Sequence, residues 1–410
     1  MKILHISTLS SGGAGNVVKI LDKALNEIVI PSNSIFQIDK GDDKNVFISS
    51  YLEKIELATK YYKNKLLLIG RDKQFEIFTY PDTSFDICKH HLVIEADLIN
   101  LHWISHFVDY SSFFKQINKP VVWTLHDMNS FTGGCHYTAG CEKFKKACEI
   151  CPQLEGTFVK NYAKNNFKIK QEALENFYNL NIVGVSSWIS EEAKQSTLLK
   201  KYKHHVIHNG IDTGIYYPEN KKEAKNSLNL PFNKKVIFYL AEDLKRKNKG
   251  FHLLKEALEK LDSPNEYILM VAGRGAEEIK LANKIEIKLL GFLASKDELR
   301  QAYSSADLTV IPSLYETFNQ VTLESMACGT PALAWDNSGP KDIISHKETG
   351  YLAKAYDIED MKSGIAWIFS NDDLQKSLCE KSHKRAKENF SQELQAERYK
   401  TLYNKILEII

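Results

Sequence analysis

The stretch that decides the fold runs from Asp307 to Ala334 and reads DLTVIPSLYETFNQVTLESMACGTPALA. Its apolar start, Leu308 to Ile311, predicts a short buried strand, and a loop follows. A helix is expected to begin near Phe318 and to end at the Cys-Gly-Thr-Pro turn, after which Pro331 to Ala334 predicts a second strand. Strand, helix and strand in this order predict a βαβ unit with parallel strands.

The same alternation of short apolar runs and helical stretches continues through the rest of the chain. Strands are expected at Ile3 to Ile6, Leu98 to His102, Val121 to Leu125, Ile182 to Val185, Val236 to Leu240, Tyr267 to Ala272 and Ile287 to Leu290. The turn signal Asn209-Gly210 lies in the stretch HNGIDTGIYYP, and the strand rhythm restarts beyond it, so the domain junction is expected near Asn209 to Pro218. The chain is therefore expected to form two open α/β domains, which is also the number that 410 residues predict.

We place the first domain at residues 1–212, with a Cys-rich insertion at 129–155, and the second at residues 213–390. The final helix, residues 391–410, has its apolar side chains mainly at spacings of three and four, which predicts one buried stripe. Ligands of open parallel sheets bind beyond the carboxyl ends of the strands. The chemistry is therefore expected in the loops that follow the strands.

Composition narrows the class of protein. A formal net charge of +2 argues against a dedicated nucleic-acid binder, and the basic stretches Lys164 to Lys170 and Lys200 to His205 are interpreted as solvated faces.

The amino terminus enters a strand pattern directly, and no apolar run approaches the roughly 18 residues that span a bilayer. We expect a cytoplasmic protein whose membrane contact, if any, is peripheral and on the inner face of the cell membrane.

Two loops carry the residue types that bind ligands. Gly12, Gly13 and Gly15 follow the first strand and open a helix, so backbone amides can approach a phosphate or sugar there; a purely structural turn is the alternative. In the deciding stretch, Glu316 lies in the loop and Glu324 follows eight residues later. Carboxylates at these places can hold hydroxyl groups, and the first amides of the helix can meet an anion.

Together these motifs resemble the retaining glycosyltransferase family 4, of the polysaccharide-assembly type, with its GT-B fold and E-x7-E motif. The likeness covers essentially the whole chain. It rests on GGAG at Gly12 to Gly15, WTLHD at Trp123 to Asp127, VIHNGID at Val206 to Asp212, the pair Lys249-Gly250, and the block from Glu316 to Pro331. It implies an acceptor domain and a nucleotide-sugar domain, both Rossmann-like, that face each other across a cleft, with the terminal helix crossing back to the first.

The resemblance also implies roles for the deciding stretch. Glu316 would face hydroxyls of the donor sugar, and Glu324 would accept hydrogen bonds from the ribose. The backbone amides of Asn319, Gln320 and Val321 would meet the sugar and the diphosphate. The family usually has glycine where this chain has Asn319, so the sugar preference stays open.

Further donor-binding roles follow from the same resemblance. Lys249 would neutralise the diphosphate. Because Leu244 stands where the family usually has arginine, Arg246 is taken as its partner, with Lys247 as the alternative. A solvated loop is the alternative for Arg246. Gly273 and Arg274 would lie near the nucleoside.

The motif at Trp123 to Asp127 implies two roles in the first domain. His126 would lie beside the reacting face of the sugar, although a histidine at the end of a strand is often structural. Asp127 is taken as an acceptor-binding residue.

Four cysteines, Cys135, Cys141, Cys148 and Cys151, lie within 17 residues. Four thiolates can hold a structural Zn²⁺ tetrahedrally, but the spacing is not that of a standard finger, so buried free thiols are the alternative.

The implied reaction is transfer of a hexose, with retention, from a nucleotide-diphosphate donor to a glycan or lipid-linked acceptor in surface polysaccharide or glycolipid synthesis. We expect no metal cofactor in catalysis, because no Asp-x-Asp motif stands at a strand end and cations can replace Mg²⁺ at the phosphates. The alternatives are a nucleotide-sugar epimerase or phosphorylase on the same scaffold, and a zinc-stabilised nucleic-acid-binding protein. A zinc-stabilised nucleic-acid-binding protein would explain the cysteine cluster but not the two-domain chain, so we expect no nucleic-acid partner.

Overall fold

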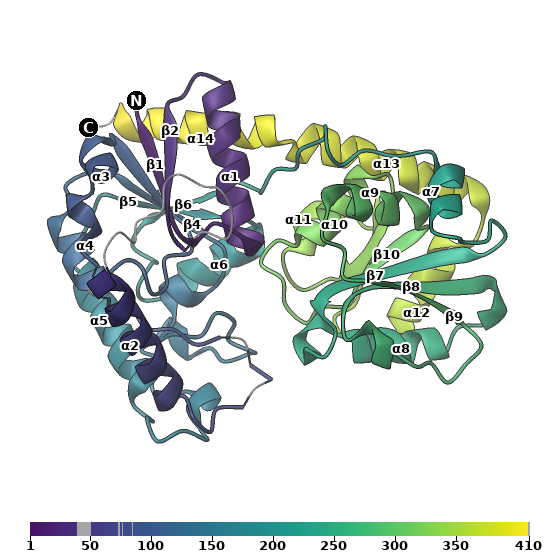
Figure 1. Cartoon of the computed structure of the whole chain (residues 1–410), viewed down its shortest axis with the longest axis horizontal. Coiled ribbons are helices and arrows are strands. Elements are labelled where there is room, and N and C mark those ends of the chain that lie inside the picture. Colours follow the sequence, from purple (N-terminus) through teal and green to yellow (C-terminus); the bar gives the residue numbers. More distant parts are fainter. Residues whose placement is uncertain (39–50, 73, 76, 84, 409–410) are drawn as a thin grey trace. The chain divides into compact units, whose positions relative to one another are not determined.

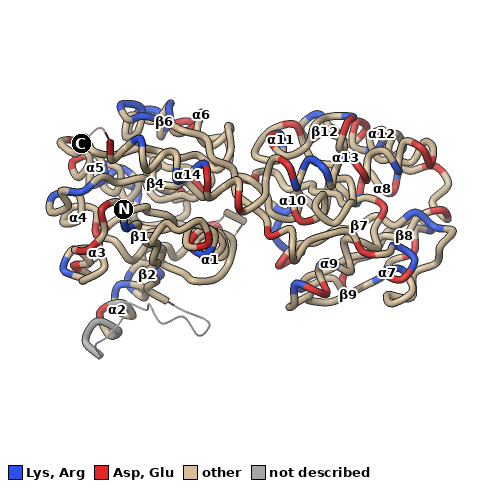
Figure 2. The backbone as a smooth tube through the Cα atoms, turned by 90° about the horizontal axis from the view of Figure 1, so that it is seen from above, with Lys and Arg blue, Asp and Glu red and all other residues tan. Residues whose placement is uncertain are grey.

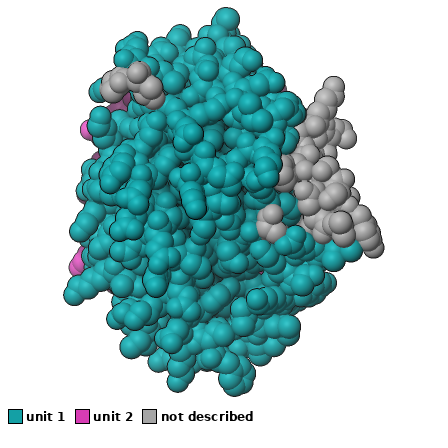
Figure 3. All heavy atoms as spheres, turned by 90° about the vertical axis from the view of Figure 1, so that its left-hand side faces the viewer, with its two compact units in different colours: residues 1–210, 393–410 teal, residues 211–392 magenta. Residues whose placement is uncertain are grey.

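The computed structural model describes residues 1–38, 51–72, 74–75, 77–83 and 85–408. It divides into two compact units. Unit 1 consists of Met1–Gly210 and Glu393–Ile410 (teal in Figure 3), and unit 2 consists of Ile211–Gln392. Each division of the chain lies two residues from the corresponding predicted boundary, at Gly210 instead of 212 and at Glu393 instead of 391.

Unit 1 is built on a six-stranded sheet in the order β2-β1-β3-β4-β5-β6, in which every neighbouring pair is parallel (Figure 1). Parallel strands joined through helices are what the alternating pattern predicts. The strands are β1 (Ile3–Leu9), β2 (Ser32–Ile38), β3 (Leu98–Leu101), β4 (Val121–Leu125), β5 (Leu180–Gly184) and β6 (Lys203–Val206).

The sequence reasoning missed both edge strands of this sheet. β2 begins with the polar residues SNS, so its first half contains no apolar run that would mark a strand. Ser32 and Ser34 donate hydrogen bonds to the Asp22 carboxylate. β6 reads KHHV and is only partly buried, because an edge strand has one unpaired side. Figure 2 shows the basic residues gathered around it, which is why this stretch resembled a solvated face.

The helices of unit 1 connect these strands. Val17, Val18, Leu21, Ala24 and Leu25 form the buried face of the first helix at helical spacing. The helices are α1 (Gly12–Glu27), α2 (Tyr51–Leu67), α3 (His91–Glu95), α4 (Tyr110–Gln116), α5 (Tyr162–Leu174), α6 (Ser187–Gln195) and α14 (Gln392–Leu407).

The last helix, α14, completes the core of unit 1 (yellow beside β1 and α1 in Figure 1). Its Tyr399 hydroxyl lies 3.0 Å from Thr124 Oγ1, and Asn100 Nδ2 donates to the Tyr403 hydroxyl at 2.8 Å. The predicted apolar stripe is thus buried against residues from the first half of the chain, among them Ile3. The last two residues, 409 and 410, lie outside the described part.

Unit 2 is built on a second parallel sheet of six strands, in the order β12-β11-β10-β7-β8-β9. Its strands are β7 (Lys235–Asp243), β8 (Tyr267–Arg274), β9 (Glu286–Gly291), β10 (Leu308–Ile311), β11 (Ala332–Trp335) and β12 (Gly350–Ala353). The short edge strand β12, GYLA, was not predicted. The expected fold class of two parallel α/β domains is confirmed.

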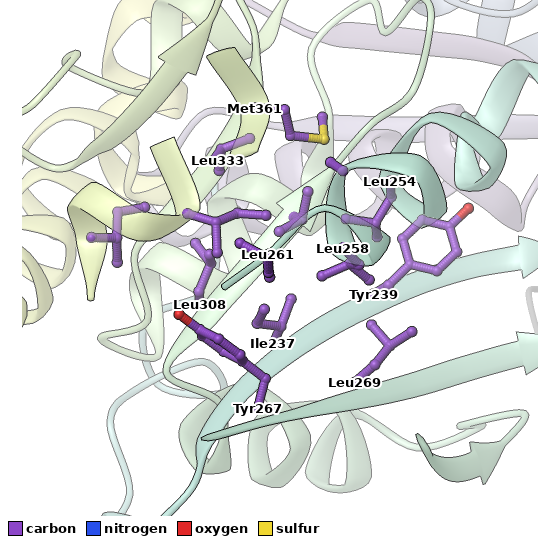
Figure 4. Packing of buried hydrophobic residues seen from close by; sticks show 14 of the residues in the cluster. Ile237, Tyr239, Leu254, Leu258, Leu261, Tyr267, Leu269, Leu308, Leu333 and Met361 are labelled. Carbon is purple, nitrogen blue, oxygen red and sulfur yellow. The ribbon is translucent and has the colours of Figure 1, made fainter. Parts of the chain in front are cut away.

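The core of unit 2 fills the space between this sheet and its helices. Figure 4 shows Ile237, Leu269 and Leu308 from the strands with Leu254 and Leu258 from the helix that follows β7. The helices are α7 (Lys221–Ser227), α8 (Phe251–Glu259), α9 (Lys296–Ser305), α10 (Gln320–Ala327), α11 (Pro340–Ile343), α12 (Ile358–Ile368) and α13 (Asp372–Phe390). Of the helices in the described ranges, none is both long and apolar enough to cross a membrane.

In each sheet the strand order reverses at one point, between β1 and β3 in unit 1 and between β7 and β10 in unit 2. Loops that leave such a point diverge to opposite faces of the sheet and open a crevice for ligands. The loops to inspect are therefore those after β1 and β3, and those after β7 and β10.

We expect Tyr403→Ala to lower the free energy of unfolding by about 3–5 kcal/mol, because it empties a fully buried aromatic site and removes the hydroxyl partner of Asn100. Tyr178→Ala is the matched control, since Tyr178 is 76% exposed. Denaturant unfolding followed by circular dichroism compares the two variants. Equal midpoints would show that α14 is not part of the core of unit 1.

Candidate functional site

Two loops of unit 2 are joined backbone to backbone at its switch point. Gly250 has φ 71°, and a Cβ there would lie 1.8 Å from the carbonyl oxygen of Pro312, so only glycine permits this approach. The Leu314 amide donates to the Asn248 carbonyl at 2.8 Å. The loop after β7 is therefore held against the loop after β10.

This contact brings two predicted catalytic residues together. Lys249 Nζ lies 2.8 Å from Glu316 Oε1, and the two side chains are 28% and 13% exposed. The Glu316 backbone is fixed on both sides, because its amide donates to Ser338 Oγ at 3.3 Å and its carbonyl accepts from the Gly339 amide at 2.8 Å. The site thus presents a half-buried cation and carboxylate on rigid loops.

The helix after this loop, α10, begins at Gln320, two residues beyond the predicted start near Phe318, because the φ of 87° and ψ of 94° at Asn319 lie outside the helical region. Phe318 is buried and packs on Phe390. Asn319 caps the helix, with its Oδ1 accepting from the Thr322 amide at 2.7 Å. Asn319 has φ 87°, a conformation that favours glycine, at the very position where the resembled family usually has glycine. The first amides of α10, starting at Gln320, have no acceptor within the helix.

Glu324 lies further along α10 between two tyrosines. The Tyr303 hydroxyl donates to Glu324 Oε2 at 2.9 Å, and Tyr216 forms a second hydrogen bond to the same carboxyl. Burial raises the pKa of Glu324 to about 7, even though both tyrosine hydrogen bonds act in the opposite direction. Near neutral pH the carboxyl is therefore partly protonated. Sequence reasoning missed both tyrosines, which come from other elements.

The remaining predicted residues of unit 2 lie around the same strand ends. Arg246 is exposed and precedes the turn Lys247–Lys249. Arg274 ends β8, pairs with Glu242 and lies with its guanidinium carbon 5.8 Å from the Phe292 ring centroid. A Cβ at Gly273 would lie 1.8 Å from the Ala241 carbonyl oxygen, so this glycine is required by packing.

In unit 1 the glycine loop opens α1 at Gly12. Among the described residues, a Cβ at Gly12 or Gly13 would meet nothing within 4 Å, so packing within this part of the chain does not require these glycines to be small. At Gly15 a Cβ would lie 2.5 Å from the Leu9 carbonyl oxygen. Gly15 therefore lets α1 pack closely on β1.

His126 and Asp127 follow β4 and line one cavity with His102, Trp103 and other residues. His126 Nε2 lies 2.9 Å from His102 Nδ1. Asp127 Oδ2 accepts from Trp103 Nε1 at 2.7 Å and lies 2.6 Å from His136 Nδ1. Burial alone would raise the pKa of Asp127, but His136 and these hydrogen bonds lower it, so Asp127 is an anion held by its neighbours.

The four clustered cysteines all line a second cavity of unit 1, together with Phe78, Phe144 and Gln153. They are free thiols, and Cys148 Sγ accepts from the Gly133 amide at 3.2 Å. In the ranges that the structure describes, no three His, Cys, Asp or Glu side chains are arranged to hold a metal ion. Zinc binding at these cysteines stays a prediction.

Lys170 corrects one interpretation of the sequence. The stretch Lys164 to Lys170 was expected to be solvated, yet Lys170 is fully buried beneath the cysteine loop. Its ammonium group donates to the Asn129 carbonyl and, at 3.1 Å, to the Thr132 carbonyl. Burial lowers the pKa of Lys170 to about 8.

Comparison with known proteins agrees with this architecture. Residues 220–388 match the family model "Glycosyl transferases group 1". Over 207 residues, 49% of this chain, the sequence is 25% identical to N-acetyl-alpha-D-glucosaminyl L-malate synthase of Bacillus anthracis. That match covers 54% of the enzyme, so the chain spans about half the length of this curated relative.

Solved structures show the same fold over the whole chain. Sucrose-phosphate synthase from Thermosynechococcus elongatus has a TM-score of 0.68 at 19% identity, with 100% of both chains covered. Anabaena Alr3699/HepE, solved in complex with UDP-glucose, has a TM-score of 0.65 at 16% identity, with 98% of this chain and 100% of the other covered. The GT-B fold expected from the sequence is thus confirmed, and residues 220–388 match the Glycosyl transferases group 1 model.

Proposed function

We propose that the chain is a retaining glycosyltransferase that moves a hexose from a nucleotide-diphosphate donor to a glycan or lipid-linked acceptor. The observation that carries the proposal is the Lys249–Glu316 pair, 2.8 Å apart at the switch point of the sheet in unit 2. It combines a cation for a diphosphate with a carboxylate for sugar hydroxyls, next to the start of α10. The match of residues 220–388 to the family model for glycosyl transferases supports the same proposal.

The chemistry of transfer needs stabilisation of charge at the leaving diphosphate. As the bond from the anomeric carbon to the phosphate oxygen breaks, negative charge grows on the diphosphate. Lys249 and the first amides of α10 supply fixed positive charge and hydrogen-bond donors for that moment. The departing oxygen then takes the proton of the acceptor hydroxyl on the same face of the sugar, so configuration is retained and no separate base is needed.

The donor's nucleoside half would lie against Glu324, Gly273 and Arg274. Glu324, with its pKa near 7 and its two tyrosine partners, can hold the two hydroxyls of a ribose. A UDP-sugar is the first donor to test, because a protein of the same fold was solved with UDP-glucose. Surface polysaccharide or glycolipid synthesis, a cytoplasmic location and peripheral membrane contact stay predictions.

Calorimetric titration with a panel of sugar nucleotides, followed by turnover with candidate acceptors, tests the proposal. A transferase releases the nucleotide diphosphate only when the acceptor is present, and the anomeric coupling constants of the product report retention. A change in the donor sugar without release would identify an epimerase. Transfer of the sugar to inorganic phosphate would identify a phosphorylase.

We expect Glu316→Gln to lower kcat/KM by about 10²-fold, or roughly 2.7 kcal/mol, because the amide cannot hold the sugar hydroxyls as the carboxylate does. Glu278→Gln is the matched control, since Glu278 also pairs with a lysine but is 62% exposed. Steady-state kinetics with the donor found by calorimetry compare the two. If the Glu316→Gln variant keeps near wild-type turnover, Glu316 does not hold the donor sugar.

We expect Lys249→Ala to lower kcat by about 10²-fold with little change in KM, because charge on the diphosphate is greatest in the transition state. Lys245→Ala removes a neighbouring exposed lysine and is the control. If only KM rises, Lys249 binds the donor equally in the ground state and in the transition state. We also expect activity without added Mg²⁺, and turnover that appears only when Mg²⁺ is added would contradict this.

We further propose that Cys135, Cys141, Cys148 and Cys151 hold a structural Zn²⁺. The Gly133 amide at Cys148, and the Gln153 and Leu154 amides at Cys151, are placed to stabilise thiolates. Burial raises the pKa of Cys148 to about 12, so without a metal the thiol stays protonated. The Lys170 ammonium acts on Cys148 and Cys135 and would offset the negative charge of a zinc–thiolate centre.

We expect purified protein to contain about one zinc per chain by elemental analysis, and chelation to lower its melting temperature. Cys141→Ser should lose the metal, whereas Cys379→Ser, which changes a cysteine outside the cluster, should keep it. Protein that contains no metal and melts unchanged in chelator would show that the four thiols are only buried.

A further inference from the structure

Three histidines of unit 1 form a hydrogen-bonded chain through their ring nitrogens. His5 Nδ1 lies 2.9 Å from His102 Nε2, and His102 Nδ1 lies 2.9 Å from His126 Nε2. The residues come from β1, from the end of β3 and from the end of β4, three neighbouring strands at the switch point of the sheet. The chain therefore leads from the interior of the sheet to the cavity at the strand ends.

All three rings are neutral near pH 7. Burial lowers the pKa of His5 and of His126 to about 4, against the attraction of Asp22 and Asp127. Burial and the two neighbouring histidines lower the pKa of His102 well below its usual range. A neutral imidazole has one N–H donor and one lone pair, so each ring donates from one nitrogen and accepts at the other.

This rule couples the three tautomers. If His5 donates from Nδ1, then His102 accepts this hydrogen bond at Nε2. His102 must then carry its proton on Nδ1, from which it donates to His126 Nε2. His126 then carries its proton on Nδ1. In the opposite direction every ring is protonated on Nε2, and His126 Nδ1 is a bare lone pair. The tautomer of His5, deep in the sheet, therefore decides what His126 offers at the cavity.

The buried end of the chain favours the first direction. His5 is 0% exposed, and among the residues that the structure describes its Nε2 has no hydrogen-bond partner. A proton on Nε2 would leave a buried N–H donor without an acceptor, which is rarer in folded proteins than a buried acceptor without a donor. Asp22 attracts such a proton, but its carboxylate oxygens accept from the hydroxyls of Ser32 and Ser34 and form no hydrogen bond with His5 Nε2.

We propose that His5 and His102 are positioning residues that hold His126 in the Nδ1–H form, so that His126 meets its substrate as a hydrogen-bond donor. The part of this statement that concerns substrate rests on the proposed function. A donor at this place recognises an oxygen lone pair of a sugar or a phosphate, and it cannot remove a proton from an acceptor hydroxyl. The mechanism proposed above needs no such base.

The tautomer can be measured in the free protein. Long-range ¹H–¹⁵N correlation spectra of ¹⁵N-histidine-labelled protein near pH 7 distinguish Nδ1–H from Nε2–H rings, and loss of a signal in His126→Asn assigns His126. We expect the Nδ1–H pattern for His126 in the wild-type protein. A wild-type Nε2–H pattern would overturn the proposal without affecting the proposed transferase activity.

His102→Gln tests whether the chain causes the preference. The glutamine amide can donate or accept, so we expect His126 in this variant to populate both tautomers. Ser7→Ala is the control, because Ser7 is buried on the same strand and lies on the same face as His5, but its hydroxyl donates to the Leu9 carbonyl and not to the histidine chain. His126 that stays fully Nδ1–H in His102→Gln would show that another contact sets its tautomer.

Discussion

The site in unit 2 depends on one close approach of backbone to backbone, between Gly250 and the Pro312 carbonyl. A single methyl group at residue 250 would lie 1.8 Å from that oxygen and separate the two loops. Lys249 directly precedes this contact on one loop, and Glu316 lies four residues beyond it on the other, so the two side chains can meet at 2.8 Å. The geometry of the charged groups is therefore set by a position that has no side chain.

The sequence predicted the elements whose signal is local. Buried strands such as Val121–Leu125 are continuous apolar runs, and the pair Lys249-Gly250 lies one residue before a helix. The strands at three sheet edges were missed, because an edge such as Lys203–Val206 need not be apolar on both faces. The prediction that Lys170 is solvated was wrong, because nothing in the run of lysines around it distinguishes this buried side chain from its neighbours.

The missed parts of the site depend on distant segments. Tyr216 and Tyr303 reach Glu324 from other elements, and His5 and His102 lie 121 and 24 residues before His126. No pattern along the chain connects such residues, because only the strand order brings β1, β3 and β4 side by side. Glu324 and His126 could thus be named from the sequence, whereas the tyrosines and histidines that contact them could be found only in the structure.

The place of α14 has a consequence for how the protein is made. Residues 211–392 form unit 2 and are synthesised before Glu393–Ile410, which belong to unit 1. While the ribosome translates unit 2, the surface of unit 1 that Tyr399 and Tyr403 will cover is open to solvent. Unit 1 cannot bury this apolar face before α14 has been made, so the face is a natural target for chaperones during synthesis.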